Sequence, residues 1–130
     1  MRVYFDTCTV IYHVERVPPW AARLDALLAL YQPNIVVSDL VRMECLVVPL
    51  RRKDTQLRQL FREFFDDEVE VTRLPAAVFD LAAELRAERA LKPVDALHAA
   101  CAIHHGCDEL WTNDDRLAAL AGRLRTRVVR

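Results

Sequence analysis

Glycine is scarce in this chain, and its scarcity narrows the kinds of ligand site that the sequence can form. Only 2 of the 130 residues are glycine. Long glycine-rich loops are therefore excluded, and neither phosphate-binding pattern, GxxxxGKS/T or GxGxxG, occurs. The apolar content of 53% nevertheless suits a packed globular core. The length favours one domain that spans residues 1–130.

Net charge and lysine are also low. The formal charge is −1, so the chain as a whole has no electrostatic attraction for a polyanion. Of the 18 basic residues, 2 are lysine and 16 are arginine, which suits bidentate phosphate contacts but is also explained by genome composition. The candidate phosphate contacts are Arg42, Arg51, Arg52, Lys53, Arg86 and Lys92.

Long apolar runs and paired cysteine motifs are absent. No run approaches the ~20 apolar residues that cross a membrane. The apolar start at 3–5 is interrupted at once by Asp6, so no signal peptide is expected and the chain should begin with its first strand. No CxxC or zinc-type spacing occurs, so free, buried thiols in a reducing cytoplasm are predicted. The four cysteines are Cys8, Cys45, Cys101 and Cys107.

Short apolar runs alternate along the chain with longer helical patterns. The predicted strands lie at about 3–5, 35–37, 69–71, 110–112 and 127–129. The predicted helices lie at about 9–14, 20–31, 39–48, 52–65, 76–90, 93–106 and 116–121. Ser38 is a plausible N-cap, Pro49 should end the helix that follows it, and Pro75 and Pro93 should open later helices. The alternation predicts an α/β fold with a mainly parallel sheet covered on both faces.

Two acidic residues follow predicted strands at their carboxyl ends. Asp6 comes directly after strand 3–5, and Asp114 lies two residues beyond strand 110–112. Parallel sheets bind ligands at this edge, so both side chains should reach the same region. Taken singly, each is also typical of a loop or helix-capping acid.

Glu44 lies on a stripe of its helix that is otherwise apolar, together with Leu40, Val41 and Val48. An unpaired carboxylate facing the sheet would cost on the order of several kcal/mol or would take up a proton. A metal ion or a salt bridge would relieve this cost.

Asp95 falls in the first turn of the helix that Pro93 opens. The helix dipole favours an acid there without any function. However, alanines at 96, 99, 100 and 102 make this helix slim, which permits close approach to the sheet and to other acids. His98, one turn on, is either a partner of these acids or a core histidine.

Several carboxylates at one edge repel each other and stay ionised together only if a cation neutralises them. Oxygen ligands with few His or Cys select Mg²⁺ or Mn²⁺ over Zn²⁺. Such ions hold phosphate groups and activate water, so a phosphodiester is the natural substrate class.

Four segments resemble the signature of the PIN domain, in the same order along the chain, and most closely that of the VapC toxins of type II toxin–antitoxin systems. They are residues 3–7, 38–44, 93–100 and 110–114. The resemblance implies a three-layer α/β/α sandwich with a five-stranded sheet, and a Mg²⁺- or Mn²⁺-dependent endoribonuclease. It makes Asp6, Glu44, Asp95 and Asp114 the catalytic, metal-binding acids, with Asp115 as the alternative to Asp114. Thr7, Thr112 and Asn113 resemble positions that contact the acids, metal-bound water or substrate.

The same resemblance implies three partners: an RNA substrate, a cognate VapB-type antitoxin and a second copy of the chain. Helices 20–31 and 39–48 form a candidate groove for the antitoxin. Trp20 and Tyr31 are candidates for the dimer interface, and are equally typical of core residues.

Two other enzyme classes lack a central group here. A haloacid-dehalogenase-type phosphatase needs a second Asp two residues after the first, where this chain has Cys8. A phospho-receiver domain needs an acceptor Asp after its third strand, where Thr72 and Arg73 lie. A PIN-fold module that binds RNA or antitoxin without catalysis remains the alternative function.

Overall fold

A five-stranded parallel sheet forms the centre of the computed structural model, which describes residues 1–120 and 123–129. The strands are β1 (Arg2–Phe5), β2 (Asn34–Ser38), β3 (Glu70–Thr72), β4 (Glu109–Thr112) and β5 (Arg125–Val128). They lie in the order β3-β2-β1-β4-β5, and each neighbouring pair is parallel. The predicted α/β fold with a parallel sheet is therefore confirmed.

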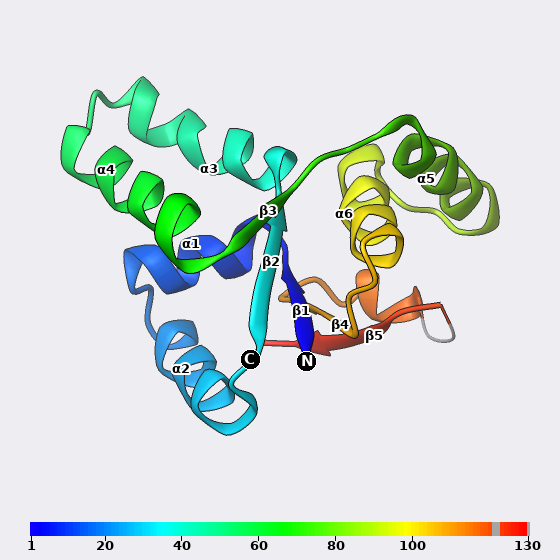
Figure 1. The fold of residues 1–130 in the computed structure, drawn as a ribbon, viewed down its shortest axis with the longest axis horizontal. Coiled ribbons are helices and arrows are strands. Elements are labelled where there is room, and N and C mark those ends of the chain that lie inside the picture. The colour runs from blue at the N-terminus through cyan, green and yellow to red at the C-terminus, as the bar shows by residue number, and fades with distance from the viewer. Residues whose placement is uncertain (121–122, 130) are drawn as a thin grey trace.

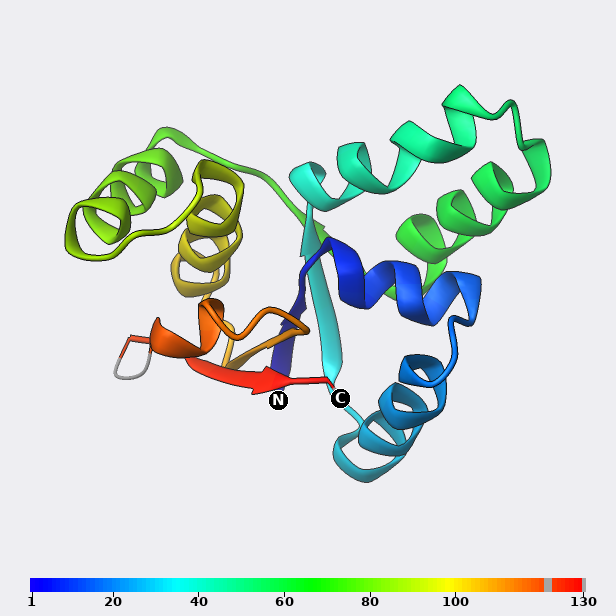
Figure 2. The ribbon, with the colours of Figure 1, turned by 180° about the vertical axis from the view of Figure 1, so that it is seen from behind.

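Helices cover both faces of this sheet. They are α1 (Thr7–Glu15), α2 (Trp20–Tyr31), α3 (Asp39–Arg51), α4 (Thr55–Glu63), α5 (Ala76–Glu88) and α6 (Pro93–His104), with a π-helical turn at Phe64–Glu68 and a 3-10 turn at Leu117–Leu120. Figure 1 shows α1 to α4 on one side of the sheet and α5 and α6 on the other. The view from behind in Figure 2 shows the same division into three layers.

The core fills the space between these layers. Residues 3–5 of the central strand are fully buried, as a parallel strand covered on both faces requires. Helix α6 contributes Ala96, Ala99, Ala100 and Ala102, which are also fully buried. Their small side chains let α6 approach the sheet closely, as the sequence predicted, and α5 packs outside it.

Two predicted helix starts are wrong because each helix begins directly after an aspartate that caps it. Helix α1 begins at Thr7, two residues earlier than predicted, because the Asp6 carboxylate accepts a hydrogen bond from the backbone N–H of Thr9. Helix α4 begins at Thr55, three residues later than predicted, because Asp54 caps it in the same way. Each cap satisfies an N–H that has no partner inside the helix.

Pro49 does not end α3, which continues to Arg51. A proline in the last turn removes only one hydrogen bond, and here its side chain is buried. The predicted helix at 116–121 is a shorter 3-10 turn at Leu117–Leu120, and position 121 lies outside the described residues.

The sheet reverses its strand order next to β1. The chain builds β2 and β3 on one side of β1 and then β4 and β5 on the other. Phe5 is in register with Trp111, so Asp6 and Thr112 follow at the carboxyl ends of two adjacent strands. A crevice between such strands is where open α/β sheets bind ligands.

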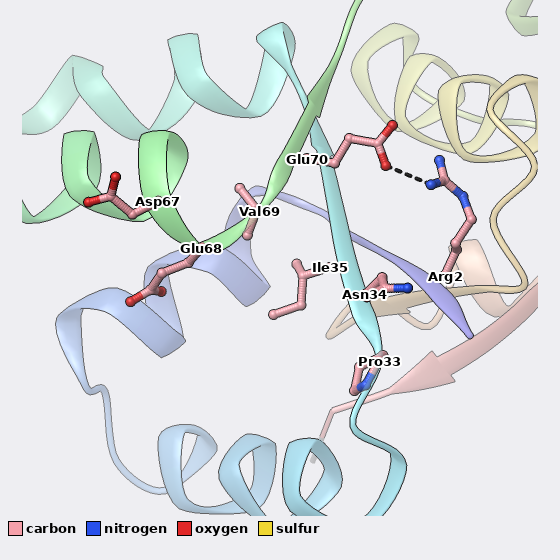
Figure 3. Close-up of a pocket in the computed structure, with 8 residues that line it drawn as sticks. All are labelled: Arg2, Pro33, Asn34, Ile35, Asp67, Glu68, Val69 and Glu70. Atoms are coloured by element: carbon pink, nitrogen blue, oxygen red, sulfur yellow. Dashed lines mark hydrogen bonds and ion pairs between the residues drawn. The ribbon is translucent and has the colours of Figure 1, made fainter.

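The opposite edge of the sheet has a pocket of about 420 Å³ that involves none of the predicted acids. Figure 3 shows Arg2, at the start of β1, reaching toward Glu70, while Ile35 of β2 points toward the segment 67–70 and Asn34 points away from it. Arg2 Nη1 donates to Glu70 Oε2 at 2.6 Å, so the charges of this pair neutralise each other.

All four cysteines are free, as predicted. Cys45 and Cys101 are buried, whereas Cys8 and Cys107 are only half-buried. Burial raises the pKa of the Cys8 thiol to about 12 and that of Cys107 to about 11, so both thiols are protonated at neutral pH.

None of the helices in the described part of the chain has both the length and the apolar character that crossing a bilayer requires.

Candidate active site

Asp6 is held rigidly at the carboxyl end of β1. Its Oδ1 accepts hydrogen bonds from Thr9 N at 3.1 Å, Thr9 Oγ1 at 2.8 Å and Cys8 Sγ at 3.0 Å. Its Oδ2 accepts a short hydrogen bond from Thr112 Oγ1. Asp6 is thus both a helix cap and a fixed carboxylate, so the capping explanation does not compete with a functional one.

Glu44 is paired from two sides through the same oxygen. Oε1 accepts from Thr7 Oγ1 at 2.6 Å and from His98 Nε2 at 2.9 Å. The hydrogen bond with His98, assisted by that with Thr7, holds the pKa of the Glu44 carboxyl below its ordinary value, although burial opposes this shift. No described residue donates to Oε2. The sequence offered a metal ion or a salt bridge for Glu44, and the structure gives its Oε1 two hydrogen-bond partners, Thr7 and His98.

Asp95 lies in the first turn of α6 and is half-buried. Burial raises the pKa of its carboxyl, and the negative charge of Asp114 raises it further. No described residue donates a hydrogen bond to this carboxylate. Its charge is therefore the least compensated among the four acids.

Asp114 is neutralised by Arg116, a residue that the sequence analysis did not single out. Arg116 Nε donates to Oδ1 at 3.1 Å and Nη2 donates to Oδ2 at 2.8 Å. This pairing lowers the pKa of the Asp114 carboxyl. Asp114 is half-buried and acts on Asp95, whereas Asp115 is exposed, which favours Asp114 as the fourth acid.

Short steps connect the four acids around one edge of the sheet. Hydrogen bonds join Thr7 to Glu44, Glu44 to His98, Asp114 to Thr112 and Thr112 to Asp6. Asp95 and Asp114 interact through their charges. Asp6 and Thr7 are neighbours in the sequence, and His98 lies one turn after Asp95 on α6. In order around the edge the residues are Asp6, Thr7, Glu44, His98, Asp95, Asp114 and Thr112. The sequence predicted that the acids reach one edge, and the structure brings them there from four separate elements.

The carboxylate oxygens of this site suit some metal ions better than others. Among the described residues, no group of three or more His, Cys, Asp or Glu side chains is placed to hold a metal as the side chains stand. Mg²⁺ usually keeps several waters and uses only one or two protein carboxylates. The uncompensated Asp95 and the Oε2 of Glu44 are hard oxygen donors of this kind. The residues therefore fit Mg²⁺ or Mn²⁺ better than an ion that needs a full protein cage.

Asn113 contacts α1 and not the acids. Its Nδ2 donates to the hydroxyl of Tyr12 at 2.9 Å, and its Oδ1 is buried without a partner among the described residues. Tyr12 in turn stacks on Trp20, with ring centroids 4.8 Å apart. Asn113 thus fixes the end of β4 against the helical layer.

The predicted phosphate contacts divide into two groups. Arg42 pairs with Asp66 at 3.2 Å, and Arg86 Nε donates to the carbonyl of Leu91 at 3.1 Å, so both have structural partners. Lys92 precedes α6, and its charge lowers the pKa of both Asp95 and Asp114. Lys92 is therefore the predicted basic residue best placed beside the acids.

The profile of the PIN domain family matches residues 3–123. The chain belongs to the PIN domain family. The match spans all four acids and strands β1 to β4 apart from Arg2, and it ends before β5. A comparison with curated proteins finds no match.

Solved structures with this PIN fold cover nearly the whole chain at low sequence identity. VapBC2 from Rickettsia felis, bound to a promoter DNA fragment, has a TM-score of 0.77 and 22% identity and covers 98% of both chains. DNA-bound VapBC from Salmonella typhimurium has a TM-score of 0.79 and 19% identity over 100% of this chain and 99% of its own. VapC20 from Mycobacterium tuberculosis, described as a toxin that cleaves the sarcin-ricin loop, has a TM-score of 0.75 and 21% identity over 96% and 98%.

Proposed function

We propose that this PIN domain is a VapC-type endoribonuclease, the toxin of a type II toxin–antitoxin pair, and that it hydrolyses RNA phosphodiester bonds with Mg²⁺ or Mn²⁺. One observation supports the proposal above all: four acids lie along the carboxyl end of the sheet where the strand order reverses, and no described residue donates a hydrogen bond to the Asp95 carboxylate there. The similarity to VapBC complexes and to an RNA-cleaving toxin supports the assignment of substrate and partner.

In this proposal Asp95 and Glu44 would contact the divalent ion directly, and Asp6 and Asp114 would hold it through its bound waters. A bound ion would supply a Lewis acid for the phosphate and a water of lowered pKa. Asp6 and Asp95 orient the attacking water, and Lys92 holds a phosphate oxygen of the substrate. Thr7 and Thr112 fix the carboxylates of Glu44 and Asp6 through their hydroxyl groups.

An Asp6→Asn variant tests this assignment. Asparagine is as good an N-cap as aspartate, so α1 should remain intact while one ionised oxygen is lost. We expect RNA cleavage to fall to background in Asp6→Asn and in Asp95→Asn. Asp80→Asn, an acid on the exposed surface of α5, is the matched control and should cleave like the wild type. Undiminished cleavage by folded Asp6→Asn would contradict the proposal.

Two further measurements test the substrate class and the metal requirement, and they distinguish a nuclease from a PIN domain that binds RNA without cutting it. Cleavage of RNA but not of the same sequence as DNA would establish the substrate class, and loss of cleavage on removal of divalent ions would establish the metal requirement. A wild-type protein that binds RNA but cuts nothing with Mg²⁺ or Mn²⁺ would instead be the non-catalytic PIN-fold module.

The partner proposal rests on exposed apolar side chains of α2 and α3. Trp20 stacks on Tyr12, whereas Tyr31 lies edge-on to Trp111 and is 38% exposed. Leu30 is 72% exposed on α2, and Met43 is 58% exposed on α3. We propose that a VapB-type antitoxin and a second copy of the chain cover such surfaces in the cytoplasm. Relief of growth arrest by the co-encoded protein, with loss of relief in Met43→Glu, would test the antitoxin contact.

A further inference from the structure

His98 lies in the middle of a buried chain of hydrogen bonds that ends on Glu44. Its side chain is 4% exposed, and its Nε2 lies 2.9 Å from Glu44 Oε1. On the other side of the ring, Nδ1 shares a hydrogen bond of 2.8 Å with the hydroxyl of Tyr4. That hydroxyl shares another, also of 2.8 Å, with Ser38 Oγ. Tyr4 and Ser38 are fully buried, so the core of the sheet connects directly to an acid at its edge.

Each hydrogen bond in this network can be assigned a donor and an acceptor without conflict. A carboxylate only accepts, so His98 Nε2 must donate to Glu44. With a neutral ring, Nδ1 accepts from Tyr4, and the oxygen of Tyr4 then accepts from Ser38. Every polar group along the chain thus has a partner, which is what a buried polar network in an apolar core requires.

Ser38 takes part in this network of hydrogen bonds instead of capping α3 with its side chain. It occupies the N-cap position of α3, where a serine hydroxyl ordinarily accepts from a backbone N–H of the first turn. Here the side chain makes no such hydrogen bond. The hydroxyl is directed to Tyr4 instead, so the residue that starts α3 is linked through two rings to Glu44 on the same helix.

The second carboxylate oxygen of Glu44, Oε2, indicates what this network of hydrogen bonds does at the site. Thr7 from α1 and His98 from α6 both bind Oε1, and no described residue donates to Oε2. Two donors from different elements prevent the carboxylate from rotating, so Oε2 keeps one direction. Neighbours of this kind orient metal ligands in many proteins and contribute to metal affinity.

We propose that His98 is a positioning residue that orients Glu44 for the divalent ion, and that Tyr4 and Ser38 act on Glu44 only through the His98 ring. This inference rests on the proposed metal-dependent function. It chooses between the two roles that the sequence left open for His98, and it adds Tyr4 and Ser38 behind that residue.

Calorimetric titration with Mn²⁺ measures the effect directly, without using cleavage. We expect His98→Leu to bind Mn²⁺ about tenfold more weakly than the wild type. His98→Gln should recover most of the affinity, because the glutamine amide nitrogen can occupy the place of Nε2 and donate to Glu44. His104→Gln, on the exposed surface of the same helix, and Tyr31→Phe are matched controls and should bind like the wild type.

A double-mutant cycle separates positioning from general packing. Tyr4→Phe removes only the hydroxyl and should weaken Mn²⁺ binding about threefold in the wild-type background. In the His98→Leu background the same change should have no further effect, because the route to Glu44 is already broken. Equal losses in both backgrounds would overturn the inference. Thermal unfolding of each variant reports whether it folds, and the Gln and Phe variants keep the test valid if His98→Leu does not.

The outcome also distinguishes this inference from the proposed function. If Asp95→Asn binds Mn²⁺ as tightly as the wild type, the proposed metal site is wrong and the inference falls with it. If Asp95→Asn binds weakly while the His98 and Tyr4 variants bind like the wild type, the positioning role alone is wrong.

Discussion

Asp95 and Asp114 show how the surrounding groups can shift the pKa values of two similar carboxyls in opposite directions. Both are half-buried carboxylates, but Arg116 neutralises Asp114 and no described residue does the same for Asp95. The pKa of Asp114 is lowered as a result, whereas that of Asp95 is raised by burial and by Asp114 itself. At neutral pH the ionised Asp95 therefore destabilises the metal-free protein.

This imbalance makes Asp95→Asn a stabilising change in the absence of metal. A carboxyl with a raised pKa stabilises the fold below its ordinary value of 3.8, and this contribution is lost as pH rises through the folded-state pKa. We expect Tm of Asp95→Asn at pH 7 to exceed that of the wild type by about 2 °C, a small shift because the group is partly solvated. The difference should vanish near pH 3. A lower Tm at pH 7 than the Asp80→Asn control would contradict this account.

Individual acids were predictable from the sequence where the signal is local. Asp6 follows a strand directly, and Asp95 follows a proline that opens a helix. The partners were less accessible, because His98 and Glu44 are 54 positions apart and meet only where α3 and α6, from opposite faces, reach the carboxyl end of the sheet. Arg116 could have been suspected, since it lies two residues after Asp114 and its backbone N–H also bonds that carboxylate.

At the scale of elements, β5 is attached to the sheet by a partly buried ion pair as well as by backbone hydrogen bonds. Arg127 donates from Nε and Nη2 to the carboxylate of Glu109, at 3.1 and 3.3 Å. Its guanidinium also lies 4.7 Å from the ring centroid of Tyr31, at the end of α2. This cluster joins an edge strand to a helix of the outer layer.

Replacement of Arg127 by Met should weaken this attachment. It leaves the Glu109 side chain, which is 4% exposed, as an unpaired buried charge. We expect the free energy of unfolding to fall by about 2 kcal/mol, less than for a fully buried pair because Arg127 is partly solvated. Urea unfolding measures this, with Arg125→Met on the same strand as an exposed control. If the double variant Arg127→Met, Glu109→Gln were as unstable as Arg127→Met, the unpaired charge would not be the cause.

The elements themselves were more predictable than their ends. Within the described residues, every strand and α-helix overlaps a predicted element, because each must bury one face against the same core, although β5 begins at Arg125 and not at 127. Their ends depend on single hydrogen bonds, such as those made by Asp6 and Asp54, and on whether a proline such as Pro49 is buried. The hydroxyl of Ser38 has two competing uses, and only the position of Tyr4 decides between them.

At the scale of the whole molecule, the candidate site joins the layers of the fold. Its acids come from the end of β1, from α3 on one face, from α6 on the other face, and from the loop after β4. An ion held there would contact segments that separate when the protein unfolds. Binding of such an ion would therefore be coupled to global stability, since an ion that binds only the folded state stabilises it.

Thermal unfolding should consequently depend on the concentration of Mn²⁺. At a concentration about 100 times Kd, a single site adds roughly 2.7 kcal/mol to the free energy of unfolding. For a chain of this length we expect Tm to rise by about 8 °C. Asp6→Asn should show little of this rise, although its cap and its Tm without metal are retained, because asparagine lacks the charge but still accepts from Thr9. Asp80→Asn should show the full rise. Equal rises in Asp6→Asn and wild type would mean that Mn²⁺ stabilises the fold from somewhere other than the edge where the acids meet.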